Sequence, residues 1–462
     1  MKKKKVLFII PDGVGIRNYL YSNVITNLKE QASIVFWSTL PEEAFAETFK
    51  LHAIPVEYRN IKLPTENLFT RLCREATTYA RLLVNAENQD NDTILTNWNK
   101  KDKRSKLRML YTLSEKIGKW ASKDYDRILK LEAKGRSFWS RKIIDETKSN
   151  LQDLQPTSIF ITHQRVASLM PICIAAKELG IKVNTVIYSW DNLPKARMAV
   201  LADNYFVWSD YMKKEMQVYY PEVKSENVIV TGTPQFEFYI DDERISDRSE
   251  FASKYKLDEN KKWICFSGDD KITSPYDPDY LRDVAEAIAK MDEKVRPQII
   301  FRRSPADNSD RYDSVLNKFS DLIVSINPLW YTQGSSWGAF FPMLDDVNLL
   351  VDLAYHCVAA INVGSTIAHD FSTFNKPCLY VKYDQKESDN WSSDIIYKFE
   401  HFKSMSGLDA VCLVETVEEW PQRIDSILFN SDCIAVDRHL WRQKIILHPL
   451  DQSSKIIAKQ FL

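Results

Sequence analysis

Short apolar runs recur along the chain and are separated by stretches with helical periodicity. The first run covers residues 6–10 and stops at Pro11-Asp12-Gly13; a helix is expected over about 18–31 and a second run over 33–38. Continuous Val, Ile and Phe runs are typical of strands that are buried on both faces of a parallel sheet. The pattern therefore predicts an α/β architecture in which helices cover both faces of the sheet.

A long helical stretch interrupts this alternation between about residues 64 and 155. Within it, apolar residues recur at near three-to-four spacing from Leu107 to Ala121, opposite a face rich in Lys and Arg. Strands are expected again at 158–162, 183–189, 204–208 and 227–231. The first half is therefore predicted to be a Rossmann-like domain over 1–240 that carries a helical insertion.

A second alternating series follows the charged segment 241–261, which contains no long apolar run and predicts a domain boundary. Its strands are expected at 263–266, 298–301, 322–325, 359–363 and 377–380. We therefore expect a second Rossmann-like domain over 241–437 and a final helix over 438–462. Two such domains, with parallel sheets facing a central cleft, would bind ligands beyond the carboxyl ends of their strands.

Charge and cysteine content narrow the functional class. A formal net charge of −1 over 462 residues argues against a general nucleic-acid binder. Residues 100–148, however, hold 16 Lys and Arg against 7 Asp and Glu. Basic helices with aromatic residues can lie on anionic membranes, although a solvated helix face explains the charge equally well.

The cysteines and apolar runs indicate a compartment. Seven scattered cysteines with no CxxC pattern are expected of reduced thiols in a cytoplasm, not of a disulfide framework or zinc site. No apolar run approaches the roughly 20 residues of a membrane-spanning helix. We therefore expect a cytoplasmic protein that is either soluble or peripheral at the inner face of the membrane.

The most informative segment is 362–380. There a predicted strand runs into Gly364-Ser365-Thr366, which opens a short helix whose free amides and dipole suit a phosphate. Asp370 lies one turn into this helix, where its carboxylate could accept hydrogen bonds from ribose hydroxyls. Asn375 is suited to end the helix in the left-handed conformation.

This segment resembles the donor-site signature of GT-B glycosyltransferases, in which Gly-Ser/Thr is followed by a ribose-binding acid and then by Gly-Lys-Pro. Here Asp370 stands in place of the usual Glu, and Asn375-Lys376-Pro377 in place of Gly-Lys-Pro. Segments 188–195 and 228–237 are similar to parts of the bacterial envelope-polysaccharide members of that superfamily. The resemblance implies the GT-B fold and transfer of a sugar from a nucleotide-sugar donor to a glycan or lipid-linked acceptor in surface polysaccharide biosynthesis.

A nucleotide diphosphate also needs cationic and backbone contacts. Arg303 follows a predicted strand of the second half, and alternation favours it over its neighbour Arg302 for facing the cleft. Ser267 and Gly268 follow the first strand of that half, with Lys271 close behind them. No acidic pair resembles a metal-binding DxD motif at a strand end, so no obligatory metal or other cofactor is expected.

A transferase that inverts configuration requires a general base near the acceptor hydroxyl. Three candidates lie at the ends of first-half strands: Asp12, His163 and Asp191. A histidine has a near-neutral pKa, and a desolvated carboxylate can do the same work, so the sequence leaves the choice open. Asn362 occupies the position, eight residues before Asp370, where retaining enzymes often carry an acid; this favours inversion.

Other functions are compatible with the same two halves. They include a polyol-phosphate transferase of the teichoic-acid type, a sugar-nucleotide 2-epimerase, and a sugar-nucleotide binder without turnover. An NAD(P)-dependent dehydrogenase is disfavoured, because the segment 13–18 lacks the third glycine of GxGxxG and no acid ends the second strand. The first expectation from the sequence is therefore a glycosyltransferase, with these three as alternatives.

Overall fold

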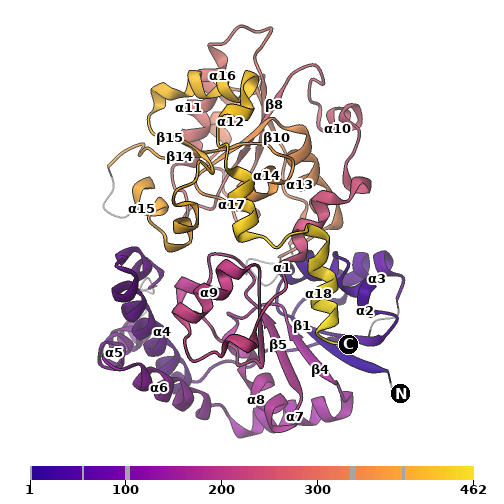
Figure 1. Cartoon of the computed structure of the whole chain (residues 1–462), viewed down its shortest axis with the longest axis vertical. Helices are drawn as coiled ribbons and strands as arrows, with labels where there is room; N and C mark the ends of the chain where they lie inside the picture. Colours follow the sequence, from indigo (N-terminus) through magenta and orange to yellow (C-terminus); the bar gives the residue numbers. More distant parts are fainter. Residues whose placement is uncertain (1–2, 55–56, 99–104, 333–339, 388–390) are drawn as a thin grey trace. The chain divides into compact units, whose positions relative to one another are not determined.

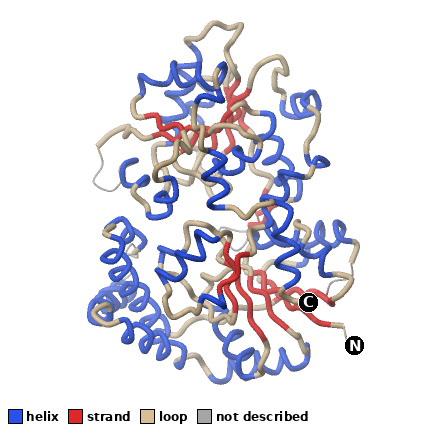
Figure 2. The backbone as a smooth tube through the Cα atoms, viewed as in Figure 1, coloured by secondary structure: helices blue, strands red, loops and turns tan. Residues whose placement is uncertain are grey.

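A computed structural model describes the chain except for residues 1–2, 55–56, 99–104, 333–339 and 388–390. The chain divides into two compact units (Figure 1). Unit 1 comprises Met1–Pro234, Phe399–His401 and Ile445–Leu462, and unit 2 comprises Gln235–Lys398 and Phe402–Lys444. In each unit helices surround one parallel sheet, which confirms the predicted fold class (Figure 2).

Unit 1 is built on a seven-stranded sheet with the order β3-β2-β1-β4-β5-β6-β7. The strands are β1 (Lys4–Ile10), β2 (Ala32–Ser38), β3 (Glu57–Asn60), β4 (Ser158–Ile161), β5 (Lys182–Val186), β6 (Asn204–Val207) and β7 (Val228–Val230). Every neighbouring pair is parallel. β3 escapes sequence prediction because this edge strand is polar and largely exposed.

The two faces of this sheet bury different kinds of side chain. Leu7 and Ile9 of β1 belong to a mainly aliphatic core packed under α7 (Arg141–Leu154) and α8 (Met170–Glu178). On the opposite face Phe8 packs edge-on against Phe160 of β4, with ring centroids 5.2 Å apart. Phe461, just after α18 (Ser453–Lys459), completes this aromatic layer, so the end of the chain belongs to unit 1.

The other helices of unit 1 differ from expectation near the first strand. They are α1 (Gly13–Gly15), α2 (Val24–Leu28), α3 (Ala46–His52), α4 (Leu68–Gln89), α5 (Ser105–Ala121), α6 (Tyr125–Ser137) and α9 (Asp210–Tyr219). The single helix predicted over 18–31 is instead α1, a π-helical turn at Ile16–Leu20, and α2. The predicted helical insertion is confirmed: α4 packs against α5 and α6 (Figure 1).

Unit 2 has a six-stranded parallel sheet with the order β10-β9-β8-β13-β14-β15. Its strands are β8 (Trp263–Ser267), β9 (Gln298–Arg302), β10 (Ile323–Ser325), β13 (Ala359–Asn362), β14 (Cys378–Val381) and β15 (Cys412–Val414), beside a hairpin of β11 (Trp330–Thr332) and β12 (Phe340–Pro342). Its helices are α10 (Arg248–Tyr255), α11 (Asp277–Ala289), α12 (Asp313–Lys318), α13 (Leu344–His356), α14 (Ile367–Thr373), α15 (Ser393–Tyr397), α16 (Trp420–Phe429) and α17 (Arg438–Ile445). The final helix expected over 438–462 is therefore two helices, α17 and α18.

Among the described residues, none of the helices has the length and apolar content to cross a membrane.

Candidate functional site

Each sheet reverses its strand order at one point, and several of the candidate residues follow the two strands that flank it. In unit 1 the chain moves outward from β1 to β3 and then returns to β4 on the other side of β1. In unit 2 it moves from β8 to β10 and then returns to β13 beside β8. Two loops diverge at such a point and leave a crevice at the carboxyl ends of the strands, where open α/β sheets bind ligands.

At the reversal point of unit 1 the structure joins two residues that are 151 positions apart. Asp12 follows β1 and His163 follows β4, and the Nδ1 atom of His163 contacts Oδ2 of Asp12. The other oxygen of Asp12 accepts a hydrogen bond from the backbone N–H of Gly15, which fixes the carboxylate. Because an ionised carboxylate only accepts, Nδ1 of His163 carries the proton and Nε2 is left as the basic nitrogen.

The environment of His163 keeps that nitrogen unengaged. Nε2 is buried and has no hydrogen-bond partner among the described residues. The imidazole packs against the ring of Tyr188, with centroids 4.1 Å apart. An oriented imidazole with one ring nitrogen held by a carboxylate and the other unengaged is the arrangement of a general base.

Asp191, the third candidate, is held differently. Ser189 Oγ and Asn192 Nδ2 donate to its Oδ1 over 2.6 and 2.8 Å, and Lys195 contacts its other oxygen. Burial alone would raise the pKa of this carboxyl, but the charge of Lys195 and these hydrogen bonds outweigh burial and lower it well below its usual range. A carboxylate so stabilised is a weak base, which favours His163 among the three candidates.

The sequence analysis does not identify two further titratable groups of unit 1, Glu215 and His401. Burial, and then the charges of Glu400 and Asp191, raise the pKa of Glu215 on α9 to about 8, so its carboxyl is protonated at neutral pH. Burial lowers the pKa of His401 to about 4, and its ring packs on Trp190. A Glu on an amphipathic helix gives no local signal of burial, and 399–401 lies far along the chain from the rest of unit 1.

At the reversal point of unit 2, Gly364, Ser365 and Thr366 connect β13 to α14, as the sequence predicts. Gly364 has a φ of +81°, and an added Cβ would lie 3.0 Å from the ring of Phe402, so glycine is required there. The amide of Ser365 donates to Oδ1 of Asn362 over 2.7 Å. That amide is therefore not available to a ligand in this structure, and the predicted phosphate contacts rest on the remaining groups of the turn.

The other predicted nucleotide contacts take distinct positions. Asp370 is half-buried, four residues after Thr366 and therefore on the same side of the helix. Asn375 has a φ of +55°, as predicted for the residue that ends the helix. Arg302 is buried in an ion pair with Asp346, whereas Arg303 is half-buried and has no ion pair within the described residues. Lys271 is exposed in the loop after β8.

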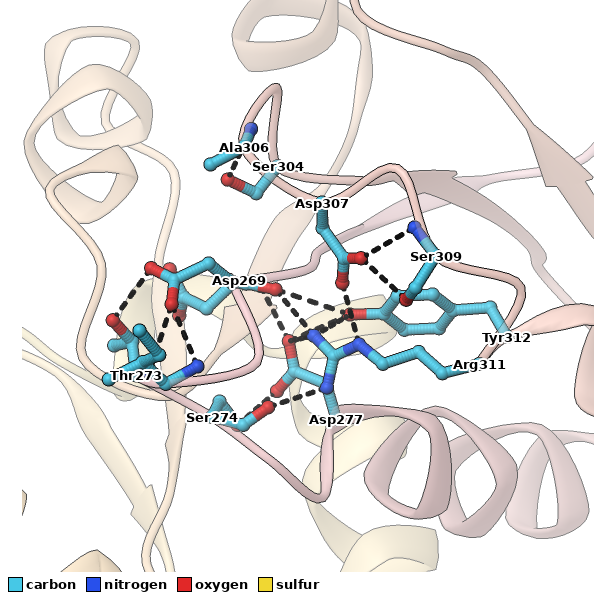
Figure 3. Close-up of polar contacts among 12 residues, drawn as sticks. Asp269, Thr273, Ser274, Asp277, Ser304, Ala306, Asp307, Ser309, Arg311 and Tyr312 are labelled. Carbon is cyan, nitrogen blue, oxygen red and sulfur yellow. Dashed lines mark hydrogen bonds and ion pairs between the residues drawn. The ribbon is translucent and has the colours of Figure 1, made fainter. Parts of the chain in front are cut away.

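The loop that follows β8 is fixed by a network that the sequence does not reveal (Figure 3). Asp277 accepts from the backbone N–H of Asp269 over 2.5 Å and from the hydroxyl of Tyr312 over 3.1 Å. Arg311 donates to the carbonyl oxygens of Asp269 and Ser274 over 2.6 and 2.7 Å. An added Cβ at Gly268 would lie 2.8 Å from the hydroxyl of Tyr312, so this loop packs too closely for a larger residue.

Burial also changes the charge of this loop. It raises the pKa of Asp277 to about 6, although hydrogen bonds from Ser274 and Asp269 oppose the change. Burial, followed by the charges of Asp277 and Asp270, raises the pKa of Asp269 well above its usual range. The loop therefore carries less negative charge than its acidic residues suggest, and repels an approaching phosphate less.

Comparisons with known proteins bear on the fold of the chain. No protein-family model matches the chain, and a search of curated proteins finds no match. Among solved structures, it is similar to the putative UDP-N-acetylglucosamine 2-epimerase from Listeria monocytogenes, with 9% identity, TM-score 0.55, and 100% and 97% of the two chains covered. It is also similar to the UDP-GlcNAc 2-epimerase from Neisseria meningitidis bound to UDP-GlcNAc, with 12% identity, TM-score 0.51 and 99% of each chain covered.

A glycosyltransferase from Rickettsia africae ESF-5 is similar as well, with 10% identity, TM-score 0.52, and 100% and 99% of the two chains covered. Epimerases nevertheless predominate among these structures, so the prediction of a glycosyltransferase is wrong and the alternative of a 2-epimerase is better supported. The error has a physical cause: a turn and helix that suit a nucleotide do not encode the reaction. The chain has the GT-B fold, two parallel-sheet α/β units of the kind found in these epimerases and in this glycosyltransferase.

Proposed function

We propose that this protein is a sugar-nucleotide 2-epimerase that acts on a nucleotide sugar such as UDP-N-acetylglucosamine. The observation that carries the proposal is the Asp12–His163 pair, an oriented base with an unengaged Nε2 at the reversal point of unit 1. The similarity of the fold to that of UDP-GlcNAc 2-epimerases supports the substrate class. In this proposal unit 2 binds the nucleotide through 364–366, Asp370, Arg303 and the loop that begins at Ser267, with Lys271 as an exposed cation in that loop.

The chemistry explains why a base is needed. The proton on C2 of the sugar is not acidic, because no carbonyl stands next to that carbon. It can leave only if its bonding electrons form a C1=C2 double bond while the C1–O bond breaks and the nucleoside diphosphate departs. Re-addition of the diphosphate to C1, with proton delivery to the other face of C2, gives the epimer with all atoms conserved.

We assign side chains of the described residues to the steps of this reaction. In unit 1, His163 Nε2 can accept a proton. In unit 2, Arg303, which has no ion pair in the described part of the chain, can stabilise a diphosphate. A second acid is needed for the opposite face. Glu215, protonated at neutral pH and with a buried Oε2 that has no hydrogen-bond partner among the described residues, is our candidate. Epimerisation uses no acceptor, so the glycan or lipid-linked acceptor expected from the sequence has no part in it.

The direct test is incubation of the purified chain with UDP-N-acetylglucosamine in D₂O, followed by proton NMR. We expect UDP-N-acetylmannosamine to appear with deuterium at C2, in reactions with or without EDTA. A panel of UDP-, GDP-, CMP- and dTDP-sugars extends the search for the substrate. Binding without deuterium incorporation would contradict the proposal and favour a non-catalytic binder, and release of a polyol phosphate from an activated polyol would favour the teichoic-acid type of transferase.

We also propose that the helical insertion rests on an anionic membrane surface at the cytoplasmic face. Met109, Leu113 and Trp120 are exposed and, at spacings of four and seven residues, share one side of α5 with Lys116. Met109 is 73% exposed and Trp120 is 55% exposed. Arg108, Lys116 and Lys119 make no ion pair within the described part of the chain; 99–104, at the start of the basic segment, lies outside it.

An apolar stripe flanked by cations is suited to the boundary between lipid headgroups and acyl chains. Each basic residue near an anionic surface contributes about 1 kcal/mol, and salt screens this contribution over about 8 Å at physiological strength. Co-sedimentation with anionic vesicles should therefore fall with added salt and fall further in Met109→Ser/Trp120→Ser. Phe429→Ser, which removes an equally exposed aromatic residue of unit 2, is the control. Absence of binding at low salt would refute the membrane proposal.

A further inference from the structure

Gln164 directly follows His163 in the loop after β4 and is almost completely buried, with 2% of its surface exposed. Its side chain makes two hydrogen bonds to the loop that follows β5. Oε1 accepts from the backbone N–H of Tyr188 over 3.2 Å, and Nε2 donates to Oδ1 of Asn192 over 3.1 Å. Gln164 therefore joins the loops at the carboxyl ends of β4 and β5, which are neighbouring parallel strands.

The direction of these hydrogen bonds is fixed by groups that cannot exchange roles. A backbone N–H only donates, so the atom of Gln164 that faces Tyr188 is the amide oxygen. At the other end, Nδ2 of Asn192 donates to Oδ1 of Asp191 over 2.8 Å, and an ionised carboxylate only accepts. The bonds therefore run from the N–H of Tyr188 through two buried amide side chains to a carboxylate. A chain of hydrogen bonds that ends on a charge is stronger than isolated bonds between neutral groups.

Tyr188 connects this chain of hydrogen bonds to the proposed base. Its ring packs against the imidazole of His163, with centroids 4.1 Å apart and planes inclined at 61°. Asp12 contacts Nδ1 of the imidazole, but one such contact fixes a single ring nitrogen and leaves the plane of the ring free to tilt. The ring of Tyr188 restricts this tilt, and the backbone hydrogen bond to Gln164 holds Tyr188 in place.

We propose that Gln164 is a positioning residue for the general base, because it fixes Tyr188, and Tyr188 keeps the imidazole of His163 in one orientation. The inference rests on the proposed epimerase activity, in which Nε2 of His163 takes the proton from C2. A base must lie within hydrogen-bonding reach of the proton that it removes, and a displacement of about 1 Å can lower a rate about a hundredfold. Loss of the positioning should therefore lower turnover without weakening nucleotide binding.

The first test is deuterium incorporation from D₂O into UDP-N-acetylglucosamine by Gln164→Met, which keeps the length of the side chain and removes both hydrogen bonds. We expect kcat to fall about tenfold or more and KM to stay unchanged, because the nucleotide contacts proposed for unit 2 are intact. In a Tyr188→Leu chain the same change should cause little further loss, since the ring through which Gln164 acts is gone. Unchanged kcat in Gln164→Met, or additive losses in the double variant, would overturn the proposal.

A second measurement needs no substrate. Diethyl pyrocarbonate acylates the unprotonated nitrogen of an imidazole, and peptide mass spectrometry gives the rate of this modification at His163. Nε2 is buried in the unaltered chain, so we expect a several-fold faster modification once Gln164→Met releases the ring of Tyr188. The matched control is Gln460→Met, a partly buried glutamine of the same unit whose side chain donates to the carbonyl of Ile456. It should leave both kcat and the modification rate unchanged.

The two measurements separate the role of Gln164 from the epimerase activity. If the unaltered chain incorporates no deuterium, the epimerase activity is refuted and the modification rate decides on Gln164. An equal rate in Gln164→Met and the unaltered chain would then overturn its role. If Gln164→Met fails to fold, Tyr188→Leu, which alters a partly exposed residue, tests the same packing and should show the same lower kcat and faster modification.

Discussion

The two strand-reversal points of this molecule are built in opposite ways. In unit 2 the turn 364–366 and Asp370 come from one continuous stretch of chain, in which a strand, a turn and a helix follow each other directly. In unit 1 Asp12 and His163 meet only because β1 and β4 are neighbours, with two strands and the whole helical insertion between them in sequence.

This difference explains which of the two sites a local residue pattern can predict. A contiguous segment carries its own geometry, so a turn that suits a phosphate can be predicted from its residues. A pair assembled by sheet topology has no spacing of its own, so the reaction it supports cannot be read in that way. The wrong prediction of a transferase concerns the reaction, which belongs to the second kind of site.

The largest expected effect concerns the Asp12–His163 pair. His163→Gln keeps the size of the side chain but cannot take a proton, so epimerisation should fall about 10²- to 10⁴-fold, the usual contribution of a general base. Calorimetry should show unchanged UDP affinity, because in this proposal the nucleotide is bound by unit 2. Asp12→Asn should lower turnover too, since it removes the carboxylate that fixes the tautomer. Full activity in His163→Gln would exclude His163 as the base.

The next prediction concerns Glu215 and the dependence of stability on pH. Its pKa is raised from 4.5 to about 8 in the folded chain, so between these values the unfolded chain has lost a proton that the folded chain retains. The free energy of unfolding therefore decreases as pH rises through this window, by at most about 4 kcal/mol. Glu215→Gln should remove this loss, and urea unfolding at pH 5 and pH 8 measures it.

The matched control for Glu215 is Glu226→Gln, an exposed residue of the same unit. It should leave the pH profile unchanged. His401 acts in the opposite direction, because its lowered pKa of about 4 costs stability as pH falls below 6.5. Identical pH profiles for Glu215→Gln and the unaltered chain would contradict the burial of an uncharged carboxyl at this position.

A smaller effect is expected in the network that fixes the loop after β8. Asp277→Ala leaves the N–H of Asp269 and the hydroxyl of Tyr312 without their acceptor, which should cost about 1–3 kcal/mol of unit 2 stability. Asp277→Asn keeps an acceptor and should recover most of this loss. Hydrogen exchange across 268–277 measures the loosening of the loop, and unaltered exchange in Asp277→Ala would refute the assigned role.

The smallest expected effect tests the contiguous segment of unit 2. Asp370→Asn should weaken binding of the nucleotide about tenfold, the loss expected for one hydrogen bond to a charged group, without affecting the fold. Asp394→Asn, an exposed acid on α15, is the control. Unchanged calorimetric affinity would remove Asp370 from the predicted site.

The sequence alone determines much of this fold because buried parallel strands leave a strong local trace. Val, Ile and Phe runs predict β1, β8 and β13 closely, and Asn375 marks the end of α14 as expected. Polar edge strands such as β3 leave no such trace. The hairpin of β11 and β12 is not predicted either, because each of its strands has only three residues and is too short to show a pattern.

Only the tertiary structure decides which charged side chains work together and in which protonation state. Arg302 and Arg303 are adjacent in sequence, yet one is buried against Asp346 and the other has no ion pair in the described chain. Glu215 looks like an ordinary surface acid until burial beside Glu400 and Asp191 raises its pKa. Local residue patterns set backbone conformation, whereas burial and the approach of distant charges set pKa values. The chemistry of this site therefore follows from packing that no short segment encodes.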